Sequence, residues 1–324
     1  MRLNAGLSMI KSFFHSLWHD LTDAFNPREW ERVTEKLKRS NWRSLLLTFR
    51  ALLPQFILYY VLLSPVVAAP LYDKLLFHPT VTGPFDAHTI VGTRIENVSF
   101  PGKNGVMLHG WFVKVPDAKR VVLLSHGNGG NLTDRMPLMA MFLRDGQSVF
   151  IWDYEGYGRS AGSPSLDNFC VDGLAAFDWL VANQGYSDSQ IIVFGESLGT
   201  GVTCQIASQR KVAGIILQSP FTSLPTLARQ KVLFLKLFPN QFFPKTGQLD
   251  NLAILSKPHA PLLIVHGKQD RLIPFEHAKK IYEKADAPKT LVELPNAGHN
   301  NIYAVDFEQY NAAVKEFLSN QIVD

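Results

Sequence analysis

The sequence predicts an α/β fold with a mostly parallel β-sheet and helices on both faces. From about residue 106 to the C-terminus, strand-like apolar runs alternate with helix-like segments, which is the order that βαβ units produce. Hydrophobic residues make up 46% of the 324 residues, enough to bury a sizeable core. Because α/β folds often run to roughly 200–250 residues as a single domain, we expect one domain over residues 73–324.

The most informative motif is Gly-Glu-Ser-Leu-Gly at residues 195–199, directly after the strand-like run 190–194. A serine at a sharp turn from a strand into a helix needs small neighbours, because the surrounding backbone packs too closely for a Cβ atom. A helix-like stretch at about 201–210 and a strand-like run at 212–217 complete the order that such an elbow requires. We therefore predict that Ser197 is a nucleophile rather than an incidental residue of a glycine-rich turn.

A serine hydroxyl is a weak nucleophile near neutral pH, so it needs a histidine base and a carboxylate that fixes the tautomer of that histidine. Two strand-like runs downstream, 261–267 and 290–294, lead into Asp270 and His299, respectively. We predict that Asp270 is the acid and His299 the base, because both follow strand ends in the order serine, acid, histidine. The alternatives are a turn residue at Asp270 and a capping residue at His299.

Acyl transfer also needs N–H donors for the oxyanion of the tetrahedral intermediate. The strand-like run 121–125 is followed by His-Gly-Asn-Gly-Gly-Asn at 126–131, and we predict that the backbone N–H groups of Asn128 and Leu198 are these donors. The alternative is a nucleotide site, but residues 126–131 lack the glycine-rich phosphate-binding patterns. Structural roles are expected for the remaining histidines, His15, His19, His78, His88, His109, His126, His259, His266 and His277.

These motifs, together with Asp-Tyr-Glu-Gly-Tyr-Gly-Arg-Ser at 153–160, resemble the α/β-hydrolase-domain serine hydrolases. More narrowly, the chain is similar over roughly residues 95–318 to their membrane-anchored branch, which includes eukaryotic protein depalmitoylases and lipid hydrolases. The resemblance implies an α/β-hydrolase fold, a triad of Ser197, Asp270 and His299, an oxyanion hole of Asn128 and Leu198, and a 153–160 loop that follows the fourth strand and braces the rim of the site. The N-terminal third departs from the cysteine-rich start of the depalmitoylases.

Residues 224–257 interrupt the alternation of strands and helices with apolar and aromatic residues among lysines. We predict a short cap over the active site, with an ordinary helix packed on the fold as the alternative. A cap of this composition favours acyl chains, because about 0.8 kcal/mol accrues per buried methylene. The two cysteines, Cys170 and Cys204, are expected to be buried free thiols. Neither has the spacing of a metal site, and we expect no metal and no cofactor.

The N-terminal region has a different character. Residues 51–72 hold no charged residue in 22 positions, and roughly 20 apolar residues suffice to span a bilayer. We predict a transmembrane helix there, with an interfacial or re-entrant segment as the alternative because of three prolines. Residues 1–50 form a basic region in which apolar residues at 9–25 follow helical spacing, and a second helix is expected to begin at Asn26-Pro27. Either helix is expected to lie on anionic lipid or to pack on protein.

The distribution of charge predicts orientation. Residues 31–50 carry six Lys/Arg, whereas residues 72–91 carry only Lys74. The positive-inside rule therefore favours a cytoplasmic N-terminus and a hydrolase domain in a periplasm or lumen. Residues 1–50 hold nine Lys/Arg against five Asp/Glu, which accounts for the whole net charge of +4. The basic balance is thus a property of the membrane flank and does not indicate a nucleic acid partner.

The function that these predictions support is a membrane-anchored serine hydrolase. It is expected to cleave carboxylic esters or thioesters of small-molecule or lipid acyl substrates through an acyl-enzyme intermediate. A serine peptidase on the same fold is the nearest alternative, since a triad alone does not distinguish an ester from an amide. A membrane-tethered binding scaffold without catalysis is the alternative from another class.

Overall fold

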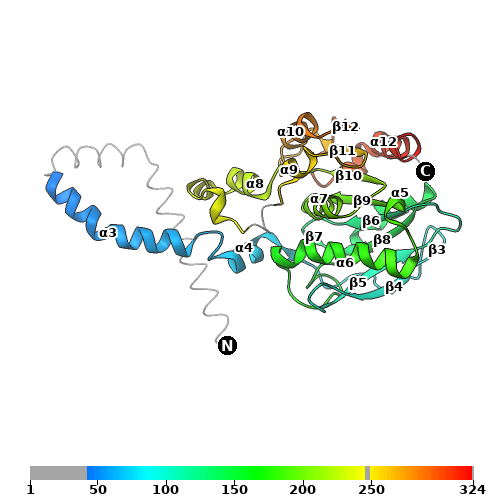
Figure 1. The fold of residues 1–324 in the computed structure, drawn as a ribbon, viewed down its shortest axis with the longest axis horizontal. Helices are drawn as coiled ribbons and strands as arrows, with labels where there is room; N and C mark the ends of the chain where they lie inside the picture. Colours follow the sequence, from blue (N-terminus) through cyan, green and yellow to red (C-terminus); the bar gives the residue numbers. More distant parts are fainter. Residues whose placement is uncertain (1–41, 245–248, 323–324) are drawn as a thin grey trace. The chain divides into compact units, whose positions relative to one another are not determined.

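The structure, a computed structural model, describes residues 42–244 and 249–322. The chain forms two compact units, Met1–Leu63 and Ser64–Asp324. In the first unit the described part is helix α3 (Trp42–Leu62), and the second unit holds the β-sheet and the remaining described helices (Figure 1).

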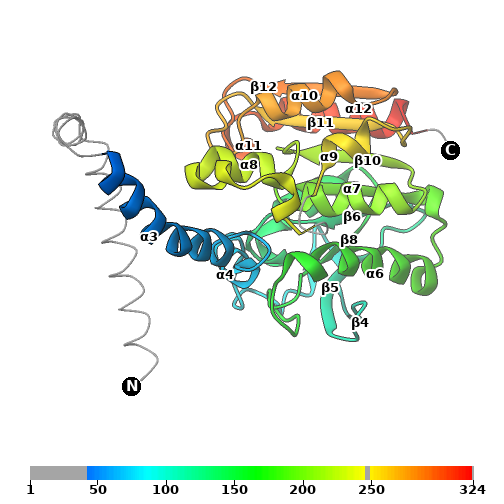
Figure 2. The ribbon, with the colours of Figure 1, turned by 60° about the vertical axis from the view of Figure 1, so that its left-hand side comes forward.

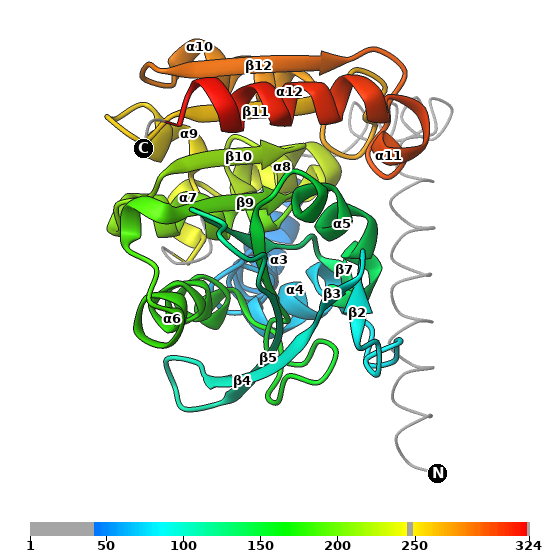
Figure 3. The ribbon, with the colours of Figure 1, turned by 90° about the vertical axis from the view of Figure 1, so that its right-hand side faces the viewer.

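An eight-stranded sheet with the order β12-β11-β10-β9-β6-β8-β5-β4 forms the centre of the second unit (Figure 3). β5 runs antiparallel to β4 and to β8, and the other neighbouring pairs are parallel. The strands are β4 (Glu96–Pro101), β5 (Met107–Val113), β6 (Val121–Ser125), β8 (Ser148–Trp152), β9 (Ile191–Glu196), β10 (Gly214–Gln218), β11 (Leu262–Gly267) and β12 (Lys289–Leu294). The predicted α/β fold with a mostly parallel sheet is confirmed.

The central strands are buried because helices cover both of their faces. Every residue of β6 and of β10 is buried, which explains why these strands are continuous apolar runs rather than alternating ones. The edge strand β12 is only partly buried and carries Lys289 and Glu293. Charged side chains on an edge strand oppose pairing with a second chain.

Each face of the sheet has its own apolar core. Helices α6 (Leu166–Gln184), α7 (Gly199–Gln209), α9 (Asn251–Leu255) and α10 (Glu276–Lys284) contribute to one core cluster. Helices α5 (Met136–Arg144) and α12 (Phe307–Asn320) contribute to the other. Figure 3 shows α6 and α7 on one side of the sheet and α5 and α12 on the opposite side. This three-layer arrangement leaves the carboxyl ends of the parallel strands free to carry a site.

Shorter elements complete the second unit. They are α4 (Ala69–Leu76), β1 (His78–Pro79), β2 (Thr89–Ile90), β3 (Thr93–Arg94), β7 (Gly129–Gly130), α8 (Leu224–Lys231), α11 (Ile302–Val305), and the 3₁₀ turns η1 (Leu132–Arg135), η2 (Asp188–Gln190), η3 (Leu233–Leu237) and η4 (Asn240–Phe242). β1 and β7 pair in parallel, with His78 opposite Gly129. The chain directly after α4 is therefore attached to the loop that follows β6.

The single helix expected over residues 51–72 is wrong in its extent. Helix α3 ends at Leu62, and α4 starts only at Ala69. Pro65 lacks an N–H and disfavours helical geometry in the residue before it, so the helix stops there, whereas Pro70 fits the first turn of α4. Among residues 42–244 and 249–322, no helix combines the length and apolarity needed to cross a membrane. The helices expected within residues 1–41 lie outside the described residues.

The cap predicted for residues 224–257, after β10, agrees with the structure only in its first part. Its first part, α8 and η3, is attached to the loop of the predicted acid, because the Lys231 ammonium donates to the Arg271 carbonyl at 2.8 Å. Leu233 and Leu237 of η3 are about two-thirds exposed, at 66% and 67%. Its last part is core: Asn251 and Leu255 of α9 are fully buried. The residues beyond about 248 therefore fit the alternative of a helix packed on the fold.

Both cysteines are free, as predicted. Cys204 is buried in α7, whereas Cys170 in α6 is partly buried. Burial raises the pKa of the Cys170 thiol to about 12. Because a thiolate is the reactive form, Cys170 is expected to be unreactive at neutral pH.

Asp172 of α6 gives a stability prediction with a defined pH dependence. Burial, together with the neighbouring Glu155 carboxylate, raises the pKa of Asp172 from 3.8 to about 7. The folded state therefore holds a proton that the unfolded state releases near pH 4, so the free energy of unfolding falls as pH rises from about 4 to about 7. Asp172→Asn should be more stable than wild type at pH 8, by about 3 kcal/mol, and should show no such gain at pH 4.

Thermal unfolding at both pH values measures this effect. The exposed Asp286→Asn is the matched control and should change neither midpoint. An Asp172→Asn protein that is no more stable than wild type at pH 8 would contradict the raised pKa.

Candidate active site

The serine elbow is built by close backbone packing between β9 and α7. Ser197 has φ of +53°, a left-handed conformation that side chains rarely adopt. A Cβ atom on Gly199 would collide with the Ser125 carbonyl, and one on Gly195 would lie 2.7 Å from the Gly199 carbonyl. The two glycines are therefore required where the motif has them. The strained turn places Ser197 directly after the carboxyl end of β9 and just before α7, and Figure 2 shows α7 packed against the sheet.

The structure brings together the three residues predicted to form the triad. His299 Nε2 lies 2.9 Å from Ser197 Oγ, and His299 Nδ1 lies 2.6 Å from Asp270 Oδ2. Ser197 and Asp270 are buried, at 6% and 5% exposure, whereas the His299 side chain is 11% exposed. The histidine thus links a serine hydroxyl to a buried carboxylate with hydrogen-bond geometry at both ring nitrogens.

Asp270 is held as a carboxylate from several sides. Its Oδ1 accepts the backbone N–H groups of Leu272 and Ile273, each at 2.8 Å. Burial raises the pKa of Asp270, but hydrogen bonds from His266, His299 and the Ile273 N–H more than offset it, so this pKa lies well below its usual range. An acid that stays ionised keeps His299 in the tautomer with a proton on Nδ1.

His266 is a contact of the acid that sequence reasoning missed. It is fully buried, its Nε2 lies 2.8 Å from the Ile273 carbonyl, and the same atom lies 3.3 Å from Asp270 Oδ2. His266 lies four residues before Asp270, and this spacing could have indicated the contact. Only a general structural role was expected for His266 from the sequence.

Two other carboxylates downstream of Ser197, those of Glu293 and Asp306, have different partners. Glu293 lies 3.0 Å from the Lys268 ammonium. Asp306 accepts from the backbone and the side-chain amide of Asn296. The geometry therefore selects Asp270.

The loop after β6 carries Asn128, one of the two predicted oxyanion donors, and its carbonyl groups are fixed. The Asn128 carbonyl accepts from the Tyr157 hydroxyl at 2.6 Å and from the His78 N–H at 3.0 Å. The neighbouring His126 carbonyl accepts from the Tyr154 hydroxyl at 2.6 Å. In the hydrogen bonds of the described residues, neither the Asn128 N–H nor the Leu198 N–H acts as a donor. Both groups are thus available to an oxyanion.

A partly buried pair of charges connects this loop to the serine elbow. The Arg135 guanidinium donates from Nε and Nη2 to the Glu196 carboxylate at 3.2 and 3.3 Å. Its Nη1 donates to the carbonyls of Gly129 and Asn131 at 3.0 and 3.4 Å. We call this arrangement the Arg135–Glu196 clamp. It joins the residue before Ser197 to the residue after Asn128. Sequence patterns did not indicate this contact, because Arg135 and Glu196 are 61 residues apart.

The 153–160 loop contacts the loop that follows β6. Asp153 Oδ1 accepts the Leu132 N–H at 2.7 Å and lies 3.3 Å from His126 Nε2. Burial raises the pKa of Asp153, but the neighbouring His109 and His126 side chains and the Leu132 N–H outweigh it and lower that pKa. Two histidines expected to be structural thus stabilise a buried carboxylate.

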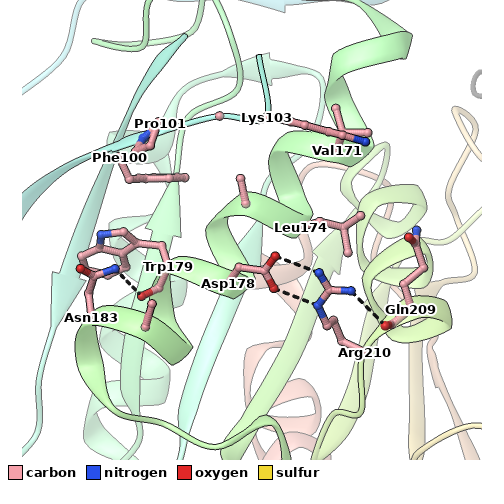
Figure 4. A pocket seen from close by; sticks show the side chains of 13 residues that line it. Phe100, Pro101, Lys103, Val171, Leu174, Asp178, Trp179, Asn183, Gln209 and Arg210 are labelled. Carbon is pink, nitrogen blue, oxygen red and sulfur yellow. Dashed lines mark hydrogen bonds and ion pairs between the residues drawn. The ribbon is translucent and has the colours of Figure 1, made fainter. Parts of the chain in front are cut away.

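One cavity of the structure lies away from Ser197, Asp270 and His299, and none of these residues contributes to its wall. Its volume is about 530 Å³, and it lies between β4, α6 and the end of α7 (Figure 4). Arg210 at its rim pairs with Asp178 through two hydrogen bonds of 2.8 Å. No cluster of three potential metal ligands occurs in the part of the chain that the structure describes.

Comparison with known proteins agrees with this geometry. Residues 116–256 match a family model described as serine aminopeptidase, S33. The uncharacterized protein Rv2307c of Mycobacterium tuberculosis is 30% identical over 252 residues, which are 77% of this chain and 88% of that protein. The α/β hydrolase domain-containing protein WAV2 of Arabidopsis thaliana is 30% identical over 267 residues, covering 76% and 87%. The chain belongs to the α/β-hydrolase family. The prediction of a hydrolase on this fold is thereby confirmed.

Solved structures of α/β-hydrolases show the same fold. An esterase of Pyrococcus furiosus matches with a TM-score of 0.65 at 20% identity, over 76% of this chain and 99% of that one. Acetyl xylan esterase 1 of a Thermoanaerobacterium species matches with a TM-score of 0.54 at 19% identity, over 70% and 85%. The family model includes Asn128 and Ser197 but ends before Asp270 and His299. The assignment of those two residues therefore rests on the distances above.

The Arg135–Glu196 clamp predicts a loss of turnover. Arg135→Met should lower kcat by about 10–100-fold and change KM by less than about threefold, because removing one oxyanion donor costs about 10²–10³ in kcat and a loosened loop loses part of that donor's effect. Arg135→Lys keeps the charge without the planar fork and should recover only part of the loss.

Steady-state kinetics on an ester substrate, with circular dichroism to verify folding, provides the measurement. Arg120→Met is the matched control, since Arg120 also binds backbone carbonyls, those of Leu318 and Ile322, but away from the triad. Equal effects of the two arginine variants on kcat would mean that the clamp acts only on stability.

Proposed function

We propose that this α/β-hydrolase cleaves carboxylic esters or thioesters through an acyl-enzyme on Ser197. The observation that carries the proposal is the continuous chain of contacts from Ser197 Oγ through His299 to Asp270, at 2.9 and 2.6 Å. The printed names of two fold neighbours, an esterase and an acetyl xylan esterase, support ester cleavage.

Acylation follows from the geometry. Ser197 Oγ attacks the acyl carbon while His299 Nε2 takes its proton, and Asp270 stabilises the imidazolium that forms. The oxyanion binds to the N–H groups of Asn128 and Leu198. When the bond to the leaving oxygen or sulfur breaks, His299 returns the proton to that atom. The alcohol or thiol leaves, and the acyl group remains on Ser197.

Deacylation uses the same residues with water. His299 removes a proton from a water molecule, the hydroxide attacks the acyl-enzyme, and the second tetrahedral intermediate uses the same oxyanion donors. Collapse of the intermediate returns the proton from His299 to Ser197 Oγ and releases the carboxylic acid. With one water molecule consumed in deacylation, bonds and protons balance in both halves of the reaction.

A serine peptidase is the second candidate function. The description of the matching family model, serine aminopeptidase, favours it. Hydrolysis of an ester and an amide with the same acyl group separates the two candidates. Faster hydrolysis of the amide would contradict the esterase proposal.

We further propose that the protein is anchored to a membrane through its N-terminal region. Phe56, Ile57 and Tyr59 of α3 are each more than half exposed, at 62%, 55% and 57%. Exposed apolar side chains in a continuous segment indicate a binding surface for protein or lipid. The six basic residues at 31–50 support a cytoplasmic N-terminus with the hydrolase domain in a periplasm or lumen. We also propose that the exposed apolar residues of η3 form a cap that contacts the acyl group of a lipid-like substrate.

The triad assignment predicts two graded losses. Ser197→Ala should lower kcat by about 10⁶, and Asp270→Asn should lower it by about 10⁴ because His299 then adopts the wrong tautomer. A fluorophosphonate probe should label wild type and should not label Ser197→Ala. Folded wild type that resists the probe would favour the scaffold alternative, and near-normal turnover of Asp270→Asn would remove Asp270 from the triad.

The membrane proposal predicts protection from protease. In sealed membranes, residues beyond about 73 should survive a protease added to the cytoplasmic face, because the basic flank keeps only the N-terminus there. Detergent should abolish the protection. Digestion of the hydrolase domain from the cytoplasmic face would overturn the orientation, and recovery of the protein in the supernatant would overturn the anchor.

A further inference from the structure

A cavity of about 160 Å³ lies directly beside the predicted base. Side chains of Asp134, Arg135, Glu196, Gln218, His299 and Tyr303 contribute to its wall. At about 30 Å³ per water molecule, it holds a group of about five heavy atoms. We propose that this cavity is the leaving-group subsite and that it takes a small, neutral, hydroxyl-bearing alcohol. The proposal rests on the esterase function proposed above.

The position of His299 explains why the leaving group enters here. In acylation His299 donates a proton to the departing oxygen, so that oxygen must lie within hydrogen-bond distance of the imidazole. The group attached to it then occupies space adjacent to His299. Glu196 in the wall directly precedes Ser197, which places the cavity next to the elbow as well.

The charges in the wall disfavour an anionic leaving group. Arg135 is the cation of the wall, and its Nε and Nη2 bind Glu196 while its Nη1 binds the carbonyls of Gly129 and Asn131. Its charge is therefore compensated by Glu196. The carboxylate of Asp134, 57% exposed, leaves one net negative charge among these three side chains. A phosphate or sulfonate on the alcohol would be repelled.

The polar atoms of the wall favour hydroxyl groups. The carboxylates of Asp134 and Glu196 offer acceptors, and the Tyr303 oxygen, whose proton goes to Gln218 Oε1 at 2.7 Å, offers another. Acceptors of this kind match the O–H donors of an alcohol with further hydroxyl groups. Pro137, Leu138 and Ile302 supply the apolar remainder of the lining, which suits a short carbon skeleton.

A series of butyrate esters that differ only in the alcohol tests the subsite. The alcohols are propyl, 2,3-dihydroxypropyl and 3-sulfopropyl, which have similar length. The dihydroxypropyl ester should have a kcat/KM about tenfold above the propyl ester, and the sulfopropyl ester should fall about tenfold below it. Equal values for all three esters would overturn the proposal.

Two variants locate the selectivity in this cavity. Asp134→Asn keeps the acceptor for the Asn131 N–H, which Asp134 binds at 2.9 Å, but removes the net charge, so kcat/KM for the sulfopropyl ester relative to the propyl ester should rise about fivefold. Asn300→Trp fills the cavity from its exposed rim and should abolish the preference for dihydroxypropyl. Asp286→Asn, at the amino ends of the strands, is the control and should change neither ratio.

Fluorophosphonate labelling of Ser197 separates failure of the subsite from failure of the esterase function. Variants that are labelled like wild type and keep the wild-type ester ratios would overturn the subsite while the esterase function stands. A wild-type protein that neither reacts with the probe nor hydrolyses any of the esters would overturn both.

Discussion

The site depends on the strained backbone at Ser197. A left-handed φ at a residue with a side chain costs of order 1–3 kcal/mol and persists only where the surroundings fix it. Here β9 and α7 fix it, because Gly195 and Gly199 let the turn approach Thr203 and the Ser125 carbonyl without a Cβ in between. The same turn aims Ser197 Oγ at His299 and leaves the Leu198 N–H unpaired in the described structure. The position of the predicted nucleophile, its contact with His299 and one predicted oxyanion donor thus follow from a single backbone conformation.

The second constraint is electrostatic. The region around Asn128 is held by two contacts that involve charged groups: the partly buried Arg135 with Glu196, and the fully buried Asp153 carboxylate with the His126 ring. An ion pair out of water gains little net stability, but removing one partner leaves an uncompensated charge. Such pairs therefore fix geometry more than they stabilise the fold. Both contacts involve residues 126–132, next to the predicted donor Asn128, which matches the need for donors that do not reorganise during the reaction.

The sequence predicted the fold, and it predicted Ser197, Asp270 and His299 as the residues that contact one another. Both predictions were possible because the signals are local: a glycine pattern at a turn, and polar residues directly after apolar strands. It did not predict the Arg135–Glu196 clamp or the contact between His266 and Asp270, since each depends on how separate loops meet at the sheet edge. The predicted extent of the helix at 51–72 was wrong because Pro65 ends the helix, although the segment carries no charge. Hydrophobicity indicates burial or lipid contact, whereas proline decides where a helix ends.

Hydrogen bonds join the chain directly after α4 to the loop that carries Asn128. They indicate how far towards the N-terminus the hydrolase domain extends. The family match starts at residue 116 and the main sheet at Glu96, so a chain shortened to about residue 90 would still contain every strand of that sheet. It would lack the His78 and Thr80 N–H groups and the Leu76 carbonyl, which are partners of the Asn128 and Gly130 carbonyls and of the Asn128 amide. The smallest intact enzyme is therefore expected to include α4, and whatever is joined upstream of α4 is attached within a few residues of the segment that pairs with the loop of Asn128.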